Sequence, residues 1–226
     1  MSDKPEAMTD EAVDEALVAA AFELAASDGW ARVSVADAAR EADIPLPRAR
    51  TRMPSRHAIL RGFGRMADNA ALAAVPGEES PREKLFDLLM LRIDVHQAHR
   101  AGVLAVLDTL FIDPGTALLL NALTRTSMRW MLDAAGVPRG GALGLISDEL
   151  RVTGLVAVWL WTIRAWRRDD SADLSATMAA LDAALTRAEN AGAWLTGRVP
   201  GAAVPVEEVA PEGDFAVDPL PAPPPT

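Results

Sequence analysis

The sequence predicts an all-α protein with a helix-turn-helix head at its N-terminal end and a helical bundle as its body. Ala and Leu are abundant, Tyr is absent and β-branched residues are sparse, and this composition favours helices. Apolar residues recur at helical spacing between breaks that contain Pro or Gly. A chain of 226 residues that is 50% hydrophobic can bury a sizeable core in one or two domains.

Composition divides the chain into four regions. Residues 1–8 and 197–226 are predicted to be disordered, because the second of them holds half of the 16 prolines together with five acidic residues. Residues 9–75 are predicted to form the helix-turn-helix domain, and residues 80–196 the helical body. The pair Pro76-Gly77 is the expected hinge between these two domains.

The first helix is expected to run from about Thr9 to Ser27. Thr9 can cap it, Asp10 and Glu11 suit its first turn, and Gly29 follows its end. One stripe of apolar residues should pack on the two short helices that follow, and it comprises Val13, Leu17, Ala20, Ala21 and Leu24.

Residues 33–60 have the outline of a helix-turn-helix. Ser34 can cap a short helix that ends in a turn at Asp43-Ile44. A second short helix opens at Pro45, and Ser55 caps a longer third one. In such a motif the second helix enters the major groove of DNA.

A block of arginines makes this segment stand out in a chain of net charge -10. No acidic residue lies between the first and the last member of the block, which comprises Arg48, Arg50, Arg52, Arg56, Arg61 and Arg65. Arginine binds phosphate and recognises guanine edges, so Arg48, Arg50, Arg52 and Arg56 are predicted to contact DNA, with Ser34 as a further phosphate contact. The alternative is a solvated basic face that pairs with the acidic first helix, since residues 1–28 hold eight acidic residues and one lysine.

The body is predicted to contain five helices. Their expected boundaries are a capping box at Ser80, a break near His96-Gln97, a helix from Asp113 to Gly136, a fourth over about residues 147–167, and a last one from Ser171. The fourth is apolar nearly all round, so it needs partners on more than one side. It is either the centre of its own subunit or half of a dimer interface.

Residues 12–65 resemble the TetR family of bacterial transcriptional regulators. The positions that match the family's helix-turn-helix without a gap are Ser34, Val35, Ala38, Ala39, Ala42, Asp43, Ile44, Arg50, Met53, Pro54, Ser55, Arg56, Ile59 and Leu60. The resemblance implies a DNA-binding repressor that recognises a palindromic operator in double-stranded DNA. It also implies a ligand-binding body, a small-molecule effector and a homodimer formed through the last two body helices.

Three departures from the family pattern leave a second interpretation open. Asp43 replaces the turn Gly, Arg50 replaces a Tyr that touches phosphate, and Pro45 and Pro47 stiffen the start of the recognition helix. The ubiquinone-biosynthesis lipid-binding proteins are similar in fold and have a degraded reading helix. The alternative function is therefore a lipid- or isoprenoid-binding accessory protein with a vestigial head.

An apolar effector site is predicted in the body. Its expected residues are Arg92, His96, Trp130, Trp159 and Trp166, with the aromatic rings lining a cavity and the polar side chains at its mouth. A small apolar effector fits this composition. The alternative is that these aromatic residues, at helical spacing, are plain core.

Several classes of function are disfavoured by what the sequence lacks. It contains no Cys, no phosphate-cradling Gly-rich loop, no nucleophile elbow and no HExxH motif, so we expect no enzyme, catalytic residue or cofactor. His96 and His99 could contact one metal ion, but only Asp94 could join them, so no metal site is predicted. The most apolar run, residues 152–163, is too short to span a membrane, and the acidic N-terminus does not look like a signal peptide. We therefore expect a cytoplasmic protein.

Overall fold

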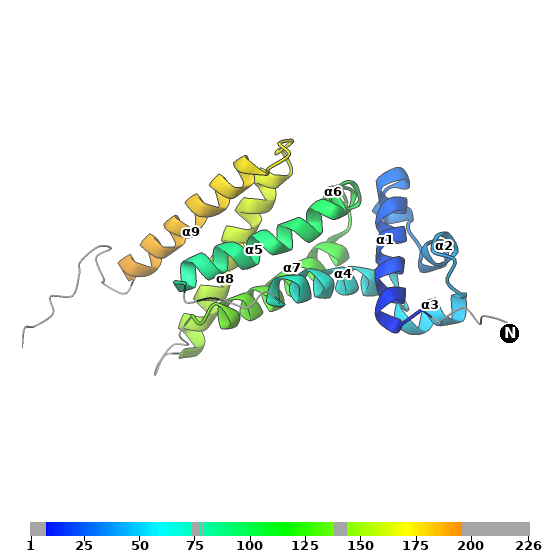
Figure 1. Ribbon diagram of the computed structural model, residues 1–226, viewed down its shortest axis with the longest axis horizontal. Coiled ribbons are helices and arrows are strands. Elements are labelled where there is room, and N and C mark those ends of the chain that lie inside the picture. Colours follow the sequence, from blue (N-terminus) through cyan, green and yellow to red (C-terminus); the bar gives the residue numbers. More distant parts are fainter. Residues whose placement is uncertain (1–7, 74–76, 78, 138–143, 196–226) are drawn as a thin grey trace, which may run out of the picture. The chain divides into compact units, whose positions relative to one another are not determined.

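The computed structural model describes residues 8–73, 77, 79–137 and 144–195, and all regular structure within them is helical (Figure 1). The prediction of an all-α fold is confirmed for these residues. In chain order the elements are α1 (Asp10–Asp28), the 3-10 turn η1 (Trp30–Arg32), α2 (Val35–Glu41), α3 (Leu46–Arg52), α4 (Arg56–Leu72), α5 (Pro81–Ala98), α6 (Arg100–Thr109), α7 (Pro114–Ala134), α8 (Gly144–Trp166) and α9 (Ser175–Leu195).

Residues 1–189 form one compact unit, and residues 190–226 form a second, of which only the end of α9 is described. The predicted disordered segments 1–8 and 197–226 lie outside the described residues, apart from Met8. The division into a head of residues 9–75 and a body of residues 80–196 stays a prediction, because helices from both parts pack on α4 within the first unit. None of the described helices is both long and apolar enough to cross a bilayer.

Local capping explains where most helices begin. The side chains of Thr9, Ser34 and Ser55 each accept a backbone N–H from the third residue that follows, at 3.1–3.2 Å. Ser80 and Glu83 form the predicted capping box at the start of α5. Side-chain oxygens at these positions satisfy amide groups that have no partner within the helix.

Two predicted boundaries differ from the structure. The break between α5 and α6 lies at His99 rather than near His96-Gln97, and the His99 amide donates to the His96 carbonyl. The last helix begins at Ser175 rather than Ser171, because Ser171 bonds to Asp169 and Leu174 takes a left-handed φ of 54°.

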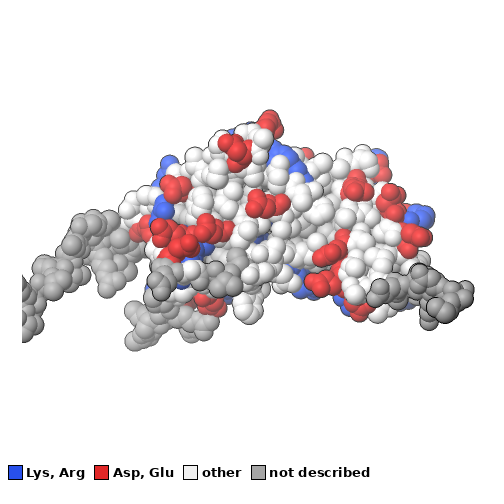
Figure 2. All heavy atoms as spheres, viewed as in Figure 1, with Lys and Arg blue, Asp and Glu red and all other residues white. Residues whose placement is uncertain are grey.

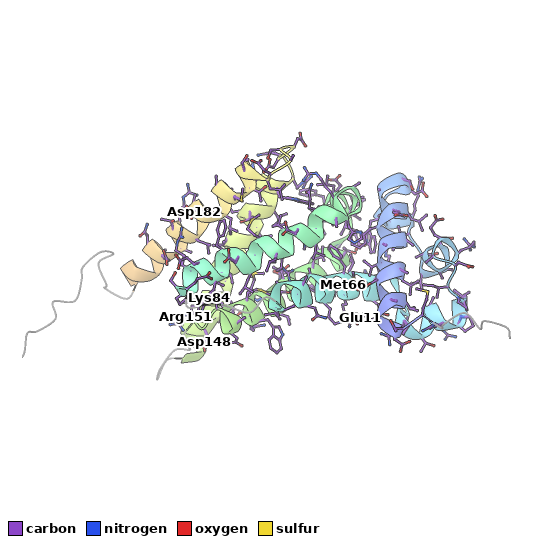
Figure 3. All side chains as sticks on the ribbon, in the orientation of Figure 1. Glu11, Met66, Lys84, Asp148, Arg151 and Asp182 are labelled. Atoms are coloured by element: carbon purple, nitrogen blue, oxygen red, sulfur yellow. The ribbon has the colours of Figure 1, made fainter. Side chains whose placement is uncertain are left out.

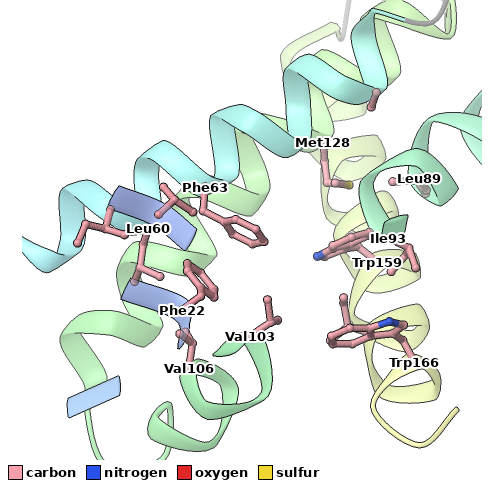
Figure 4. Close-up of a cluster of buried hydrophobic side chains, with 14 of the residues drawn as sticks. Phe22, Leu60, Phe63, Leu89, Ile93, Val103, Val106, Met128, Trp159 and Trp166 are labelled. Atoms are coloured by element: carbon pink, nitrogen blue, oxygen red, sulfur yellow. The ribbon is translucent and has the colours of Figure 1, made fainter. Parts of the chain in front are cut away.

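The core lies where α1, α4, α5, α6 and α8 bring aromatic and aliphatic side chains together. Figure 4 shows Phe22 next to Phe63, whose ring centroids are 4.5 Å apart, and Trp159 and Trp166 projecting from α8. Helix α6 approaches α1 so closely that a Cβ atom at Gly102 would clash with the backbone of Phe22. Only glycine fits at this crossing.

Helix α9 is held by an ion pair, whereas helix α8 has an apolar face that is exposed. Helix α9 is bound to α5 through Arg82, whose Nη2 lies 2.6 Å from the carboxylate of Asp182, labelled in Figure 3. Helix α8 buries one apolar face and leaves a second apolar face exposed. The exposed large side chains on that second face are Leu150, Leu160 and Trp161.

Candidate nucleic-acid interface

The turn between α2 and α3 closes the helix-turn-helix as predicted. Asp43 takes a left-handed φ of 50°, its amide donates to Arg40 O at 3.3 Å, and the Ile44 amide donates to Ala39 O at 2.8 Å. These two bonds form a Schellman motif, which satisfies the last carbonyls of α2. Asp is one of the few residues besides Gly that tolerates this conformation.

Helix α3 is seated by a small apolar side. Pro45 is its N-cap and Pro47 lies in its first turn, where a missing N–H costs nothing. Ala49 and Met53, four residues apart, are buried in the core beside α1. Burial of this side leaves the opposite side of α3 open to solvent.

That open side consists of Leu46, Pro47, Arg50 and Thr51, all of which are exposed. Thr51 donates its hydroxyl to the Pro47 carbonyl at 2.9 Å, so this hydroxyl already has a partner within α3. The Arg50 guanidinium has no hydrogen-bond or ion-pair partner among the described residues. It is therefore ready to meet an external partner.

Arg48 and Arg52 project to a different side of α3 and bind α1. Arg52 forms two hydrogen bonds to Asp14, Nε to Oδ1 at 2.8 Å and Nη2 to Oδ2 at 2.6 Å, and a third to Asp10 at 3.1 Å. Arg48 Nη2 reaches Asp10 at 3.2 Å and also donates to the Met8 carbonyl. The arrangement matches, for these two residues, the alternative of a basic face paired with the acidic first helix.

The two ion pairs differ in strength. Asp14 is buried and also receives Arg65 at 3.3 Å, and its bidentate bond raises the pKa of Arg52. Asp10 is exposed and holds Arg48 by a single contact. A bidentate pair with a buried carboxylate is structural, whereas a single exposed pair is worth only about 0–1 kcal/mol. Exchanging its Asp10 contact, with the bond to the Met8 carbonyl, thus costs Arg48 less than leaving Asp14 would cost Arg52.

Arg56 and Ser34 also have partners within the protein. Arg56 Nη2 lies 3.0 Å from Asp113 at the start of α7, and Nη1 donates to Ala31 O at 3.0 Å. The Ser34 hydroxyl accepts the Asp37 amide and donates to its carboxylate at 2.6 Å. Of the predicted DNA contacts, only Arg50 is without a partner among the described residues.

The charge distribution follows from this pairing. On the face seen in Figure 2, basic and acidic side chains adjoin one another over the helix-turn-helix instead of forming a continuous basic patch. No sequence pattern singles out Asp10, Asp14 and Asp113 as the partners of the arginines. The signal that existed was the excess of acidic residues over residues 1–28.

In the body, His96 lies buried among aromatic rings. Its ring centroid is 5.0 Å from Phe63, 5.3 Å from Trp159 and 6.4 Å from Trp166. Burial, with the nearby Arg92 charge second, lowers the pKa of His96 to about 3, so the ring is neutral and Nδ1–H donates to the Arg92 carbonyl at 2.6 Å.

Arg92 is the buried charge of this cluster. It forms an ion pair with Asp68 of α4, and its guanidinium carbon lies 5.0 Å from the centroid of the Trp159 ring. Burial lowers the pKa of Arg92 to about 10, which leaves it protonated at neutral pH. Asp68 in turn accepts the Ser127 hydroxyl of α7 at 2.7 Å. The Arg92 Nε has no hydrogen-bond partner among the described residues.

Four of the five residues predicted for an effector site therefore come together: Arg92, His96, Trp159 and Trp166. Trp130 does not join them, because its side chain is 56% exposed on α7. Met128 and Met131 occupy the buried side of α7, and the helical repeat turns Trp130 away from them. No group of three His, Asp or Glu side chains suited to a metal ion occurs in the part of the chain that the structure describes.

Comparison with known proteins finds relatives in structure alone. No protein-family model and no curated protein matches the sequence. The TetR transcriptional regulator from Nitrosomonas europaea ATCC 19718 is similar with a TM-score of 0.63 at 20% identity, covering 78% of this chain and 97% of its own. A TetR transcriptional regulator from Rhodococcus sp. RHA1 is similar with a TM-score of 0.54 at 17% identity, covering 80% and 97%. These likenesses confirm the fold that the sequence resemblance implied: the chain folds as TetR transcriptional regulators do.

Proposed function

We propose that this protein is a transcriptional regulator that binds double-stranded DNA by inserting α3 into the major groove. The observation that supports this most directly is the open side of α3, held by α1 in a helix-turn-helix of the TetR fold. Arg50 supplies a guanidinium for guanine or phosphate, and Leu46, Pro47 and the Thr51 methyl offer apolar contact to thymine methyl groups.

The other arginines divide by how easily they exchange partners. Arg48 gives up its exposed contact with Asp10 to bind a backbone phosphate, and Arg52 stays on Asp14 to fix the angle of α3. Ser34, the N-cap of α2, contributes a further phosphate contact. Phosphate contacts of this kind set the orientation on the duplex, whereas base contacts set specificity.

The proposed regulator is a homodimeric repressor that recognises a palindromic operator. The exposed apolar face of α8 supports dimerisation through the last two helices, and a two-fold dimer presents its two α3 helices to half-sites about one helical turn apart. Its proposed effector is a small apolar molecule with one acceptor group, bound beside Trp159 and Trp166. The buried and unpaired Arg92 Nε supports that acceptor group.

Binding to DNA from the protein's own upstream region, against a scrambled duplex, tests the proposal. Arg50→Ala is expected to weaken specific binding by about 1 kcal/mol or more, because it removes a base or phosphate contact. Arg168→Ala is the matched control, since it removes one exposed arginine from the connection after α8. Fluorescence anisotropy at several salt concentrations measures both the affinity and its salt dependence.

Equal affinities of the two variants would contradict the role of Arg50. Failure of the wild-type protein to prefer its own upstream DNA would contradict the regulator itself. Native mass spectrometry then decides whether the alternative applies, because a lipid carrier would be expected to retain an isoprenoid on purification.

A further inference from the structure

The N-terminus of α7 binds one of the arginines of the proposed DNA interface. Arg56 is the first residue of α4, and its Nη2 lies 3.0 Å from Oδ2 of Asp113, the N-cap of α7. Helix α7 belongs to the predicted body, so a group outside the helix-turn-helix holds a side chain that the sequence predicts to contact DNA. No other proposed DNA contact is held in this way in the part of the chain that the structure describes.

Asp113 is fixed on α7 by bonds of its own. Its Oδ1 accepts the Thr116 amide at 3.0 Å, and its Oδ2 accepts the Thr116 hydroxyl at 2.8 Å. These bonds lower the pKa of Asp113, so the carboxylate is charged at neutral pH. His57 Nε2 lies 3.3 Å from the same hydroxyl, and because the hydroxyl proton goes to Asp113, His57 is the donor. The carboxylate therefore moves with α7.

The Arg56–Asp113 pair is open to competition. The two side chains are 32% and 23% exposed, so a phosphate can approach the guanidinium from solvent. Surface ion pairs are typically worth a factor of up to about five. A backbone phosphate can replace Asp113, but only at that cost.

A second link ties the far end of α4 to α7. The Ser127 hydroxyl of α7 donates to Asp68 of α4 at 2.7 Å, and Asp68 also pairs with the buried Arg92. Helix α7 thus holds α4 at both ends, and one of these links meets the aromatic cluster of the proposed effector site. A shift of α7 would change the distance between Asp113 and Arg56.

We propose that Asp113 is a regulatory latch: it competes with DNA phosphate for Arg56, so that the position of α7 sets how available Arg56 is to DNA. The latch rests on the proposed DNA-binding function and concerns the regulation of that same interface.

Asp113→Asn tests the latch with the cap retained. Asn caps helices as well as Asp does, but it lacks the charge that holds Arg56. The full chain carrying this change is expected to bind duplex DNA about two- to fivefold more tightly. The logarithmic salt dependence should steepen by about 0.9, the value for one additional phosphate contact. The matched control is Asp108→Asn, which removes an exposed carboxylate five residues earlier that pairs with Arg167 instead.

A double-mutant cycle separates the latch from a general effect of charge. In a protein that already carries Arg56→Gln, Asp113→Asn should increase the affinity for DNA no more than Asp108→Asn does. An equal gain with and without Arg56 would overturn the latch, and so would weaker binding of Asp113→Asn, which would mean that Asp113 positions Arg56 for DNA. Thermal unfolding of each variant checks that the fold is intact. If neither the wild-type protein nor any variant binds DNA, the proposed function is overturned together with the latch. If the wild-type protein binds DNA and Asp113→Asn binds with the same affinity, the latch alone is overturned.

Discussion

At the scale of a single residue, the turn before α3 contains a strain that one substitution should relieve. Asp43 occupies the left-handed position of the Schellman motif, a backbone conformation that is strained for residues with a Cβ atom and unstrained for glycine. Asp43→Gly is expected to raise the free energy of unfolding by about 0.5–1 kcal/mol, the relief of strain exceeding the added entropy of the unfolded chain. Urea denaturation at constant m-value measures the change.

The end of α7 provides the reciprocal control. Gly136 has a φ of 71°, and the same pair of bonds closes the helix, from Gly136 N to Asp133 O and from Val137 N to Leu132 O. A Cβ atom there would meet nothing within 4 Å, so Gly136→Ala tests backbone strain alone. It should destabilise by about 1 kcal/mol. If both substitutions shifted stability in the same direction, left-handed strain would not be the cause.

At the scale of an element, the connection between α8 and α9 depends on the buried carboxylate of Asp169. One oxygen accepts the Ser171 amide and hydroxyl, and the other accepts the Thr177 amide and hydroxyl, both at 2.7 Å. Asp169→Asn replaces one acceptor by an amide donor, so it should cost about 2 kcal/mol in unfolding free energy. Asp173→Asn, in the same connection, is the matched control, because Asn accepts the Ser175 amide as well as Asp does.

The contribution of Asp169 should also depend on pH. Hydrogen bonds from Ser171, and next those from Thr177, lower the pKa of Asp169 in the folded state. Because the pKa is lower in the folded state, the ionised carboxylate stabilises the fold fully at pH values above the unfolded-state pKa of about 4. This stabilisation is lost as the pH falls toward the folded-state pKa. The difference in unfolding free energy between wild type and Asp169→Asn should therefore be constant from about pH 5 to 8 and become smaller below about pH 4. A difference that grew on acidification would contradict this assignment.

Elements whose boundaries are set locally could be predicted from the sequence. Thr9, Ser34, Ser55 and Ser80 cap the helices for which they were identified, because a cap bonds only two or three residues along the chain. The start of α9 could not be predicted in this way. Asp169 reaches across eight residues to Thr177, and that bond, with the turn at Leu174, delays the helix.

The sequence predicts which arginines share a side of α3, but not which side of the helix faces α1. The spacing of Arg48 and Arg52 places both on one side of a helix, with Arg50 turned away from them. Which side faces α1 depends on how the two helices cross, and no local pattern encodes that crossing. For the same reason Trp130 was expected beside Trp159 and Trp166 but lies on the surface of α7.

At the scale of the whole molecule, helix α8 presents an exposed face that carries three large apolar side chains, Leu150, Leu160 and Trp161. Exposed residues recur along it at helical spacing as Leu150, Thr153, Ala157, Leu160 and Trp161. The Arg187 guanidinium of α9 lies 5.4 Å from the Trp161 ring centroid. The large apolar side chains of this stripe resemble the centre of an interface, and Thr153 and Arg164 are its exposed polar members.

Leu160→Glu tests the homodimer. Its side chain is 60% exposed, so the change should be tolerated by the folded subunit, yet it would place a charge in the centre of the proposed interface. The dissociation constant of the dimer, measured by sedimentation equilibrium, should increase at least about tenfold, since a loss of about 1.4 kcal/mol in association free energy suffices for that factor. Leu118→Glu is the matched control, because Leu118 is 71% exposed on α7, away from the α8 stripe.

The two variants should also differ on DNA if two heads read one palindrome. When one half of a dimer is bound, the second half binds its half-site as an intramolecular step. Loss of the dimer should therefore reduce the affinity for a full operator far more than the affinity for an isolated half-site. Leu160→Glu is therefore expected to lose most of the difference in affinity between full site and half-site, and Leu118→Glu to keep it. If Leu160→Glu stayed dimeric, or if Leu118→Glu dissociated instead, the interface would lie on another face, and the spacing of the two α3 helices would have to be worked out from that face.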